Sequence, residues 1–305
     1  MSADSQAHVS RQGILSVSMS AILWGTVGIA TQAIYRQSDL TAITVGFYRL
    51  ACAFPLVAFL CWKIVDRQNF YLSPRLFWKM MLIGVMLALY QVCFFAAIGY
   101  VGVAVATLIT LCTAPVLVSL ISAVALKERL TGYTMISLAA ALVGTVLLVG
   151  LPEDTAVKND VVRGVALALG SATGYALVTL MGRSIADTCH PIFSTTLAFG
   201  SGALFLFPLA ANNAFSAAYS KEIWGLILYV GLLPTAVAYT LFFFGMRSIK
   251  ASTASILTLL EPLTATLLAW IVFAEHLAPS GLIGAVLLLA AMVVLYQGEK
   301  ATRSG

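Results

Sequence analysis

The chain has 305 residues, of which 61% are hydrophobic and 10% are charged, and its mean hydropathy is +0.98. Soluble domains carry about 25% charged residues, so this composition indicates a polytopic membrane protein whose loops are too short to hold a soluble domain. The five cysteines form no CxxC pair and the three histidines are scattered. We therefore expect no metal site and no cofactor.

The first predicted element is a membrane span. Residues 1–13 form a polar tail, and an uncharged run extends from Gln12 to Tyr35. The apolar core of a signal peptide has roughly 7–15 residues, which is shorter than this run, and no small-residue cleavage site stands out after it. We expect a first span that is retained in the protein.

Further charge-free windows follow, each long enough to cross a bilayer, which takes about 20 residues in a helix. The ten windows are 14–34, 41–62, 79–98, 103–126, 132–151, 163–182, 190–210, 222–246, 251–273 and 278–297. The uncharged stretch from Met80 to Leu126 is too long for one span, so GYVG (99–102) is expected to form a tight turn within it. The predicted fold class is an all-α integral membrane protein with ten transmembrane helices.

The basic residues are distributed unevenly between the two sides of the membrane. With the N-terminus inside, twelve of them fall on the inner side and five on the outer side or within the membrane. The positive-inside rule then places both termini, residues 1–13 and 298–305, in the cytoplasm. This placement explains the net charge of +5 without a nucleic-acid partner. We expect a multi-pass protein of the inner (plasma) membrane, either a monomer or a weak dimer.

The two halves of the chain repeat one pattern. APVLVSLISAVALKERLTG (114–132) lies 147 positions before EPLTATLLAWIVFAEHLAP (261–279), and this offset aligns Pro115 with Pro262 and Glu128 with Glu275. Five spans per half is an odd number, so the second copy must enter the membrane from the opposite side. The prediction is an inverted repeat with one half at 14–151, an outer connecting loop at 152–162 and the other half at 163–297.

This repeated pattern resembles the EamA repeat of the drug/metabolite transporter superfamily. The proline, the glutamate at the following helix turn and the small residues of the last span match in each half, and the resemblance covers about residues 14 to 297. It implies a secondary transporter that works by alternating access on a small-molecule substrate bound near the midplane between the halves. Members that resemble this chain export amino acids, drugs or other metabolites.

Two ionisable side chains are predicted to lie deep in the bilayer. Glu261 is about eleven residues, or roughly 16 Å, from the inner end of its span, and Arg49 lies at a similar depth in the second span. An ionised carboxylate facing lipid costs at least a few kcal/mol. Glu261 therefore carries a proton, binds a substrate ammonium group or packs beside Pro262. Arg49 pairs with Glu261, holds a substrate carboxylate or reaches the outer interface.

Aromatic side chains with polar atoms also lie inside the predicted spans. Together with Gln91 they are Trp24, Tyr90, Tyr175 and Tyr239. Buried tyrosine and tryptophan usually need a hydrogen-bond partner, so these residues are candidates to line a substrate cavity, and the alternative is helix packing or anchoring at the interface. Trp24 and Tyr175 align when Ser20 is set on Ser171, which predicts that they face each other across the pseudo-symmetry axis.

The repeated prolines and glutamates have structural or gating roles in this scheme. Pro115 and Pro262 each remove a backbone donor and free a carbonyl four residues earlier, so they are either hinges of a gate or fixed bends. Glu128 and Glu275 precede the fifth and tenth spans, where a carboxylate complements the N-terminus of a helix. We expect both glutamates to be structural.

The resulting functional hypothesis is an exporter of small polar metabolites, with amino acids or related zwitterions preferred and proton coupling through Glu261 as a candidate driving force. Arg49 and Glu261 would serve the carboxylate and the ammonium group. The alternatives on the same fold are export of organic cations or drugs, and export of nucleoside-type metabolites. A membrane-embedded enzyme or receptor would need an ionisable cluster at one membrane face or a soluble domain, and the sequence has neither. We therefore expect no enzymatic activity.

Overall fold

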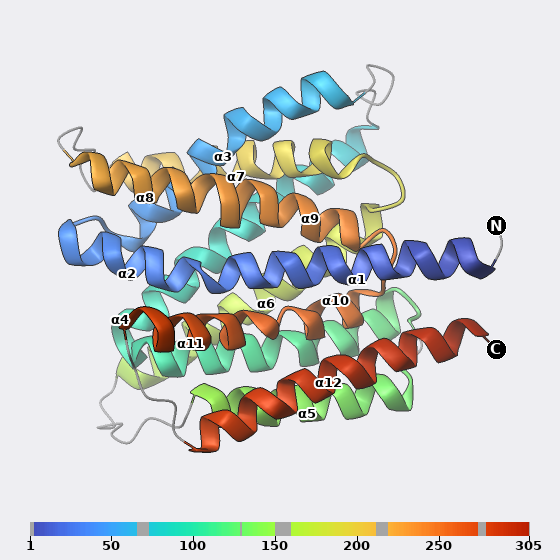
Figure 1. The fold of residues 1–305 in the computed structure, drawn as a ribbon. Coiled ribbons are helices and arrows are strands. Elements are labelled where there is room, and N and C mark those ends of the chain that lie inside the picture. The colour runs from blue at the N-terminus through green and yellow to red at the C-terminus, as the bar shows by residue number, and fades with distance from the viewer. Residues whose placement is uncertain are drawn as a thin grey trace.

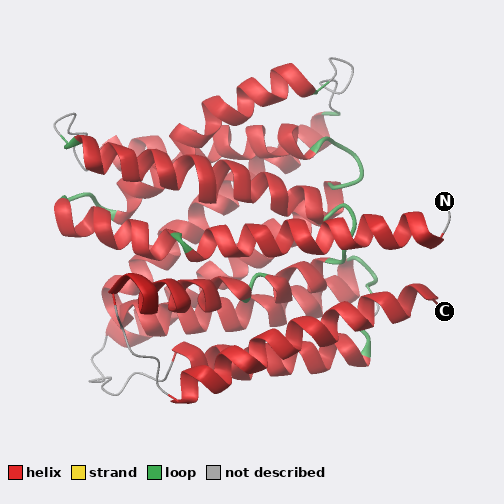
Figure 2. Ribbon diagram, viewed as in Figure 1, coloured by secondary structure: helices red, strands yellow, loops and turns green. Residues whose placement is uncertain are grey.

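The computed structural model describes residues 3–65, 73–128, 130–149, 160–211, 219–273 and 279–304. Within these ranges the regular structure is entirely helical, as Figure 2 shows. The first half of the chain contains α1 (Ala3–Gly25), α2 (Val27–Gln37), α3 (Ala42–Ile64), α4 (Pro74–Ala125) and α5 (Gly132–Val149). The second half contains α6 (Asp160–Ile185), α7 (Pro191–Ala211), α8 (Lys221–Gly231), the π-helix η2 (Leu232–Val237), α9 (Ala238–Gly245), α10 (Ala251–Leu257), α11 (Leu260–Phe273) and α12 (Pro279–Ser304).

These helices supply the membrane spans that the hydropathy of the sequence predicts. Nine stretches of the described chain are long and apolar enough to cross a bilayer, and Gly132–Leu148 is a shorter apolar helix at the position of the predicted fifth span. The nine stretches are Arg11–Tyr35, Ile43–Ile64, Pro74–Ala97, Ala106–Ala125, Val161–Ile185, Pro191–Ala211, Lys221–Gly245, Ala251–Leu268 and Pro279–Gly298. The predicted all-α membrane fold is confirmed.

The connection between the third and fourth spans differs from the prediction. A tight turn was expected at residues 99–102, but α4 is helical without interruption for 52 residues. A straight helix of that length would measure roughly 78 Å, whereas the hydrocarbon core is about 30 Å thick. α4 therefore cannot be one straight crossing, and Figure 1 shows its earlier and later parts running in different directions. The chain makes this change of direction within helical backbone.

The packing of the helices joins the two halves in symmetry-related pairs. α1 packs against α9, and α6 packs against α4. The first span of each half therefore packs against the third span of the other half. α3 packs against α7, and α5 packs against α12 at one edge of the molecule (Figure 1). Such reciprocal pairing is what two copies of a five-span unit produce when a pseudo-two-fold axis in the membrane plane relates them.

Glycines permit a close contact between α5 and α12. A β-carbon at Gly144 in α5 would lie 2.9 Å from the carbonyl oxygen of Gly284 in α12, and a β-carbon at Gly284 would lie 2.5 Å from the carbonyl oxygen of Gly144. Lipid offers apolar surface of its own, so helices in a membrane associate through close packing rather than through hydrophobic exclusion from water. The reciprocal glycines let the two backbones touch and hold the fifth and tenth spans together.

Three spans are interrupted near the middle of the molecule. The first span changes from α1 to α2 at Thr26, the eighth contains η2 between α8 and α9, and the ninth is divided into α10 and α11 at Thr258 and Leu259. Unwound or irregular backbone at membrane depth is tolerated where it is buried in protein or lines a water-filled cavity. The three interruptions therefore indicate where the functional site lies.

Candidate functional site

The interruptions of the first and ninth spans lie against each other. A β-carbon at Gly25 would lie 2.7 Å from the carbonyl oxygen of Glu261 and 2.6 Å from the β-carbon of Thr264. Only glycine permits this approach, because any side chain at position 25 would collide with the backbone of α11. The end of α1 therefore lies directly on the first turn of α11.

Hydroxyl groups satisfy the backbone at the break in the first span. The Thr26 hydroxyl donates to the carbonyl of Leu23 at 2.7 Å and accepts from the Tyr229 hydroxyl at 2.9 Å. Tyr229 belongs to α8, so the break in the first span is also fixed to the eighth span. All three interrupted spans are thus connected through short contacts.

The break in the ninth span sets the position of Glu261. Leu259 donates to the carbonyl of Ile256 at 3.1 Å and Glu261 donates to the carbonyl of Thr258 at 2.9 Å, both three residues back instead of four. Pro262 follows in the first turn of α11, where a missing N–H costs little. The carbonyl of Thr258, which Pro262 was expected to leave free, therefore has a donor.

Glu261 itself has a partly accessible side chain without a direct partner. The residue is half-buried, and its carboxylate makes no hydrogen bond or ion pair with any part of the chain that the structure describes. It lies in the first turn of α11, where the N-terminus of the helix attracts negative charge. The carboxylate is thus available to a proton or to a bound cation.

Four of the predicted aromatic residues form one central cluster. The Trp24 ring lies 4.8 Å from the Tyr239 ring and 6.5 Å from the Tyr175 ring in an edge-on arrangement, and the Tyr90 ring lies 5.8 Å from the Tyr175 ring, also edge-on. The contact between Trp24 and Tyr175 is the one predicted from the alignment of the two halves. Edge-on and tilted pairs are favoured by the charge distribution of aromatic rings.

Hydrogen bonds connect this aromatic cluster to the break in the ninth span. The hydroxyls of Tyr90 and Tyr239 are hydrogen-bonded to each other. The Tyr175 hydroxyl donates to the Thr258 hydroxyl at 3.2 Å, three residues before Glu261. A change in the backbone at Thr258 would therefore alter the positions of both Glu261 and the aromatic cluster.

Arg49 is buried within the protein. Its side chain is 6% exposed, and its Nε donates to the Thr235 hydroxyl in η2 at 3.2 Å. It forms no ion pair with Glu261, although it is close enough to act electrostatically on Glu261 and on the tyrosine pair Tyr90 and Tyr239. Arg49 and Glu261 thus lie near the same cluster, since Arg49 acts electrostatically on Tyr90 and Tyr239 and Glu261 acts on Tyr175 and Tyr239.

Two buried polar groups of the cluster have unused hydrogen-bonding capacity. Gln91 is 4% exposed, and neither its amide nitrogen nor its amide oxygen has a hydrogen-bond partner of normal geometry; the Tyr239 hydroxyl lies near it. The indole nitrogen of Trp24 is also buried without a partner. Most buried polar groups are paired in native proteins, so these atoms are available to a ligand.

The two repeated prolines lie in different surroundings. Pro262 is in the first turn of α11 directly after a break, whereas Pro115 lies inside the uninterrupted helix α4. The sequence repeat predicts matching kinks in the two halves. The structure has a helix break at Pro262 and continuous helix at Pro115, so the halves are asymmetric at this point.

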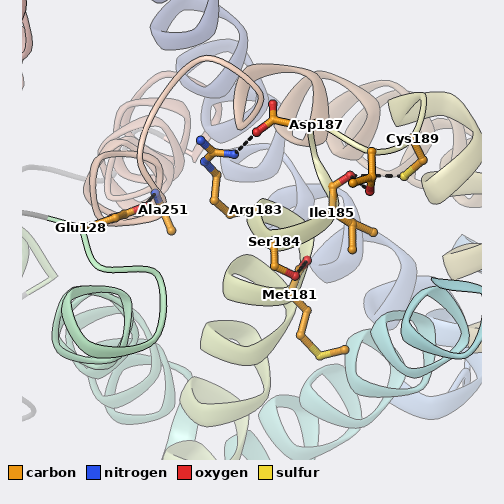
Figure 3. A network of polar contacts seen from close by, with 9 residues as sticks. Glu128, Met181, Arg183, Ser184, Ile185, Asp187, Cys189 and Ala251 are labelled. Carbon is orange, nitrogen blue, oxygen red and sulfur yellow. Dashed lines mark hydrogen bonds and ion pairs between the residues drawn. The ribbon is translucent and has the colours of Figure 1, made fainter. Parts of the chain in front are cut away.

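Glu128 has a different role from the one expected. Instead of complementing the N-terminus of α5, its carboxylate accepts from the backbone N–H groups of Ala251 at 2.8 Å and Ser252 at 3.3 Å, and from the Ser252 hydroxyl at 2.9 Å. Figure 3 shows Glu128 beside Ala251, together with the ion pair of Arg183 and Asp187. Glu128 therefore links the end of α4 to the start of α10 in the other half. Glu275 lies outside the described residues.

Thr26, Thr258 and Thr235 complete this region but were not predicted from the sequence. All three lie at interruptions of a span, and their hydroxyls connect one helix to another. A usable signal exists for one of them, because Thr235 directly follows Pro234. A hydroxyl next to a carbonyl that a proline frees is a natural substitute for the lost donor.

Comparison with known proteins establishes the family. The model of the EamA-like transporter family matches the chain twice, over residues 11–150 and 162–297. The chain belongs to the EamA-like transporter family. As an EamA protein it is a membrane-embedded transporter, and the resemblance seen in the sequence is confirmed.

Individual relatives agree with this assignment. The EamA protein is 32% identical over 283 residues to the uncharacterized transporter YwfM of Bacillus subtilis, covering 92% of each chain. It is 25% identical over 291 residues to the uncharacterized inner membrane transporter YicL of Salmonella typhimurium, covering 93% of this chain and 95% of that one. A solved crystal structure shares its fold with a TM-score of 0.81 at 18% identity, covering 92% of this chain and 97% of the other. The names of these relatives specify no substrate.

Proposed function

We propose that this transporter exports amino acids or closely related zwitterions by alternating access. The observation that carries the proposal is that Arg49 and Glu261, two side chains of opposite charge type, lie near one aromatic cluster with no ion pair between them in the described chain. A zwitterion would place its carboxylate on the arginine and its ammonium group on the glutamate. An apolar side chain would then pack on the aromatic rings.

The energetics of burial support a zwitterionic substrate. Removing a charge from water without a partner costs several kcal/mol, so Arg49 without a counter-charge is a cost to the empty transporter, and Glu261 adds a second cost whenever it is ionised. A bound zwitterion would offset both costs, because it supplies the missing opposite charge at each end. A cargo with only one charge would leave either Arg49 or Glu261 uncompensated.

We also propose that Glu261 carries a coupled proton when no substrate occupies the site. Its half-buried carboxylate lies in the first turn of α11, beside the break at Thr258 and Leu259. Protonation neutralises the acid and removes the requirement for a counter-charge. Binding of a proton and binding of an ammonium group are then alternatives at one carboxylate, which is the condition for exchange transport.

The proposed orientation follows the distribution of basic residues. The predicted spans assign twelve of them to the side of the N-terminus and five elsewhere, so we propose that both termini lie in the cytoplasm and that the protein spans the inner (plasma) membrane. Under this orientation the contact between Glu128 and α10 is on the cytoplasmic side.

An organic cation is the second candidate cargo, because aromatic rings together with a carboxylate form a cation site that needs no arginine.

A counterflow screen in proteoliposomes distinguishes a zwitterionic cargo from an organic cation. Liposomes are loaded with an unlabelled amino acid, its decarboxylated amine, a nucleoside or a cationic drug, and uptake of the matching labelled compound is measured. The proposal predicts counterflow with amino acids and little with the amines. Counterflow with amines and drugs but none with amino acids would reject it.

A further inference from the structure

The π-helix η2 has a local cause that can be traced to one residue. Pro234 has no N–H, so the carbonyl of Val230, four residues earlier, loses its normal helical donor. The Thr235 hydroxyl takes that place and donates to the Val230 carbonyl at 2.7 Å. An unpaired carbonyl at membrane depth costs several kcal/mol, so the proton of the Thr235 hydroxyl is committed to this bond.

The committed proton determines what else Thr235 can do. With its own proton used, the hydroxyl oxygen can only accept, and the group that donates to it is Nε of Arg49 at 3.2 Å. An arginine side chain has donors and no acceptor, so the pair is chemically matched. Thr235 is fully buried and Arg49 is 6% exposed, which excludes competition from bulk water.

The geometry leaves the functional end of the arginine free. Only Nε, the nitrogen nearest the aliphatic chain, is used by Thr235. The two terminal amino groups make no hydrogen bond within the described chain, and they are the groups that bind a carboxylate end-on with two parallel bonds. The hydrogen bond at Nε removes rotational freedom from the side chain and thereby fixes the orientation of the two terminal amino groups.

We infer that Thr235 is a positioning residue for the substrate carboxylate: the π-helical turn at Pro234 and Thr235 holds Arg49 by its Nε so that both terminal amino groups are presented to the anionic end of the cargo. This inference rests on the proposed function, since it assigns to Arg49 the carboxylate of an amino acid. It explains why an irregular turn occurs in the eighth span directly opposite Arg49.

The test compares substrates that differ only in the carboxylate. L-leucine with isopentylamine, and L-phenylalanine with 2-phenylethylamine, are assayed by competition in proteoliposome counterflow with wild type, Thr235→Val and Thr235→Ser. Thr235→Val is expected to lower the preference for amino acid over amine about tenfold, because loss of one hydrogen bond to a charged group is worth roughly one such step. Thr235→Ser keeps the hydroxyl and is expected to restore the preference.

A matched control separates positioning from general damage to the eighth span. Thr240→Val removes a hydroxyl that donates to the carbonyl of Ala236 at 2.7 Å on the same span, without an arginine partner. It is expected to leave the preference unchanged. Thr235→Ala is assayed in parallel, so that the test does not depend on whether the valine variant folds. The thermal midpoint of each variant in detergent is measured first.

The outcomes distinguish failure of the positioning role of Thr235 from failure of the proposed amino acid export. Equal losses of amino acid and amine binding in Thr235→Val and Thr235→Ala would overturn the positioning role and leave Thr235 as a structural hydroxyl. A wild-type protein without preference for the amino acid would overturn the proposed function itself. In the Arg49→Lys background, Thr235→Val should have no further effect on the preference, and an additive effect would contradict the inference.

Discussion

Arg49 is buried and Glu261 is half-buried, and these two side chains of opposite charge type do not pair with each other in the described chain. The Nε of Arg49 donates a hydrogen bond to the Thr235 hydroxyl. Glu261 lies in the first turn of α11, directly after the break in the ninth span. A direct salt bridge between them would have neutralised the region permanently. Their separation allows a ligand or a proton to control the local charge, which a transport cycle needs.

Arg49→Lys tests the carboxylate contact at this scale. Lysine keeps the positive charge but lacks the planar two-pronged donor geometry of arginine. We expect affinity for amino acids to fall at least about tenfold, equivalent to about 1.4 kcal/mol, while affinity for the decarboxylated amines stays nearly unchanged. Competition counterflow measures both, and parallel losses would show that Arg49 is structural.

Gln91 provides a second residue-scale test, in which stability and function move in opposite directions. Its buried amide has no hydrogen-bond partner of normal geometry, and a buried unsatisfied polar group costs about 1–3 kcal/mol. Gln91→Leu, which has similar size, is expected to raise the thermal midpoint of the substrate-free protein and to reduce transport. Lower stability with unchanged transport would show that the amide packs rather than binds.

At the scale of elements, α10 depends on a residue of the other half. It is seven residues long, too short to be stable alone, and its first N–H groups are satisfied by Glu128 at the end of α4. Lys127 precedes this glutamate with φ of 55°, a left-handed conformation that turns the chain toward α10. The end of one repeat thus stabilises the interrupted span of the other.

Glu128→Ala should therefore destabilise the protein although it lies far from the aromatic cluster. Loss of a helix-capping side chain costs about 0.5–2 kcal/mol, measurable as a lower thermal midpoint in detergent. Glu128→Gln keeps an acceptor oxygen and should lose less. Asp187→Ala breaks the exposed ion pair with Arg183, which is worth little, and serves as the control. A Glu128→Ala protein as stable as this control would contradict the capping role.

The sequence predicts elements better than it predicts their interruptions. Charge-free windows locate the spans because the bilayer fixes their length, and Pro115 and Pro262 reveal the repeat because the motif around them recurs. The break at Thr258, the π-helix at Thr235 and the contact of Glu128 with α10 could not be predicted in the same way. Threonine is compatible with a regular helix, and Thr258, Thr235 and Glu128 make their contacts with partners more than 80 residues away, which a local sequence pattern does not reveal.

At the scale of the whole molecule, the two halves are alike in packing and unlike in chemistry. The reciprocal pairing of α1 with α9 and of α6 with α4 follows the inverted repeat. The break and the carboxylate at Glu261, by contrast, correspond to continuous helix and Ala114 in the first half. In the proposed cycle, the symmetric scaffold would supply two equivalent conformations, open to either side, and Glu261 would be the place at which a proton acts.

Transport by Glu261→Gln is the most direct test of this account. Glutamine has nearly the same shape but cannot exchange a proton, so the variant is expected to lose amino acid uptake driven by a pH gradient in inverted vesicles. Exchange of internal for external amino acid, which needs no net proton movement, should persist, and both are measured in the same preparation. Uptake by Glu261→Gln with the gradient dependence of the wild type would contradict the account.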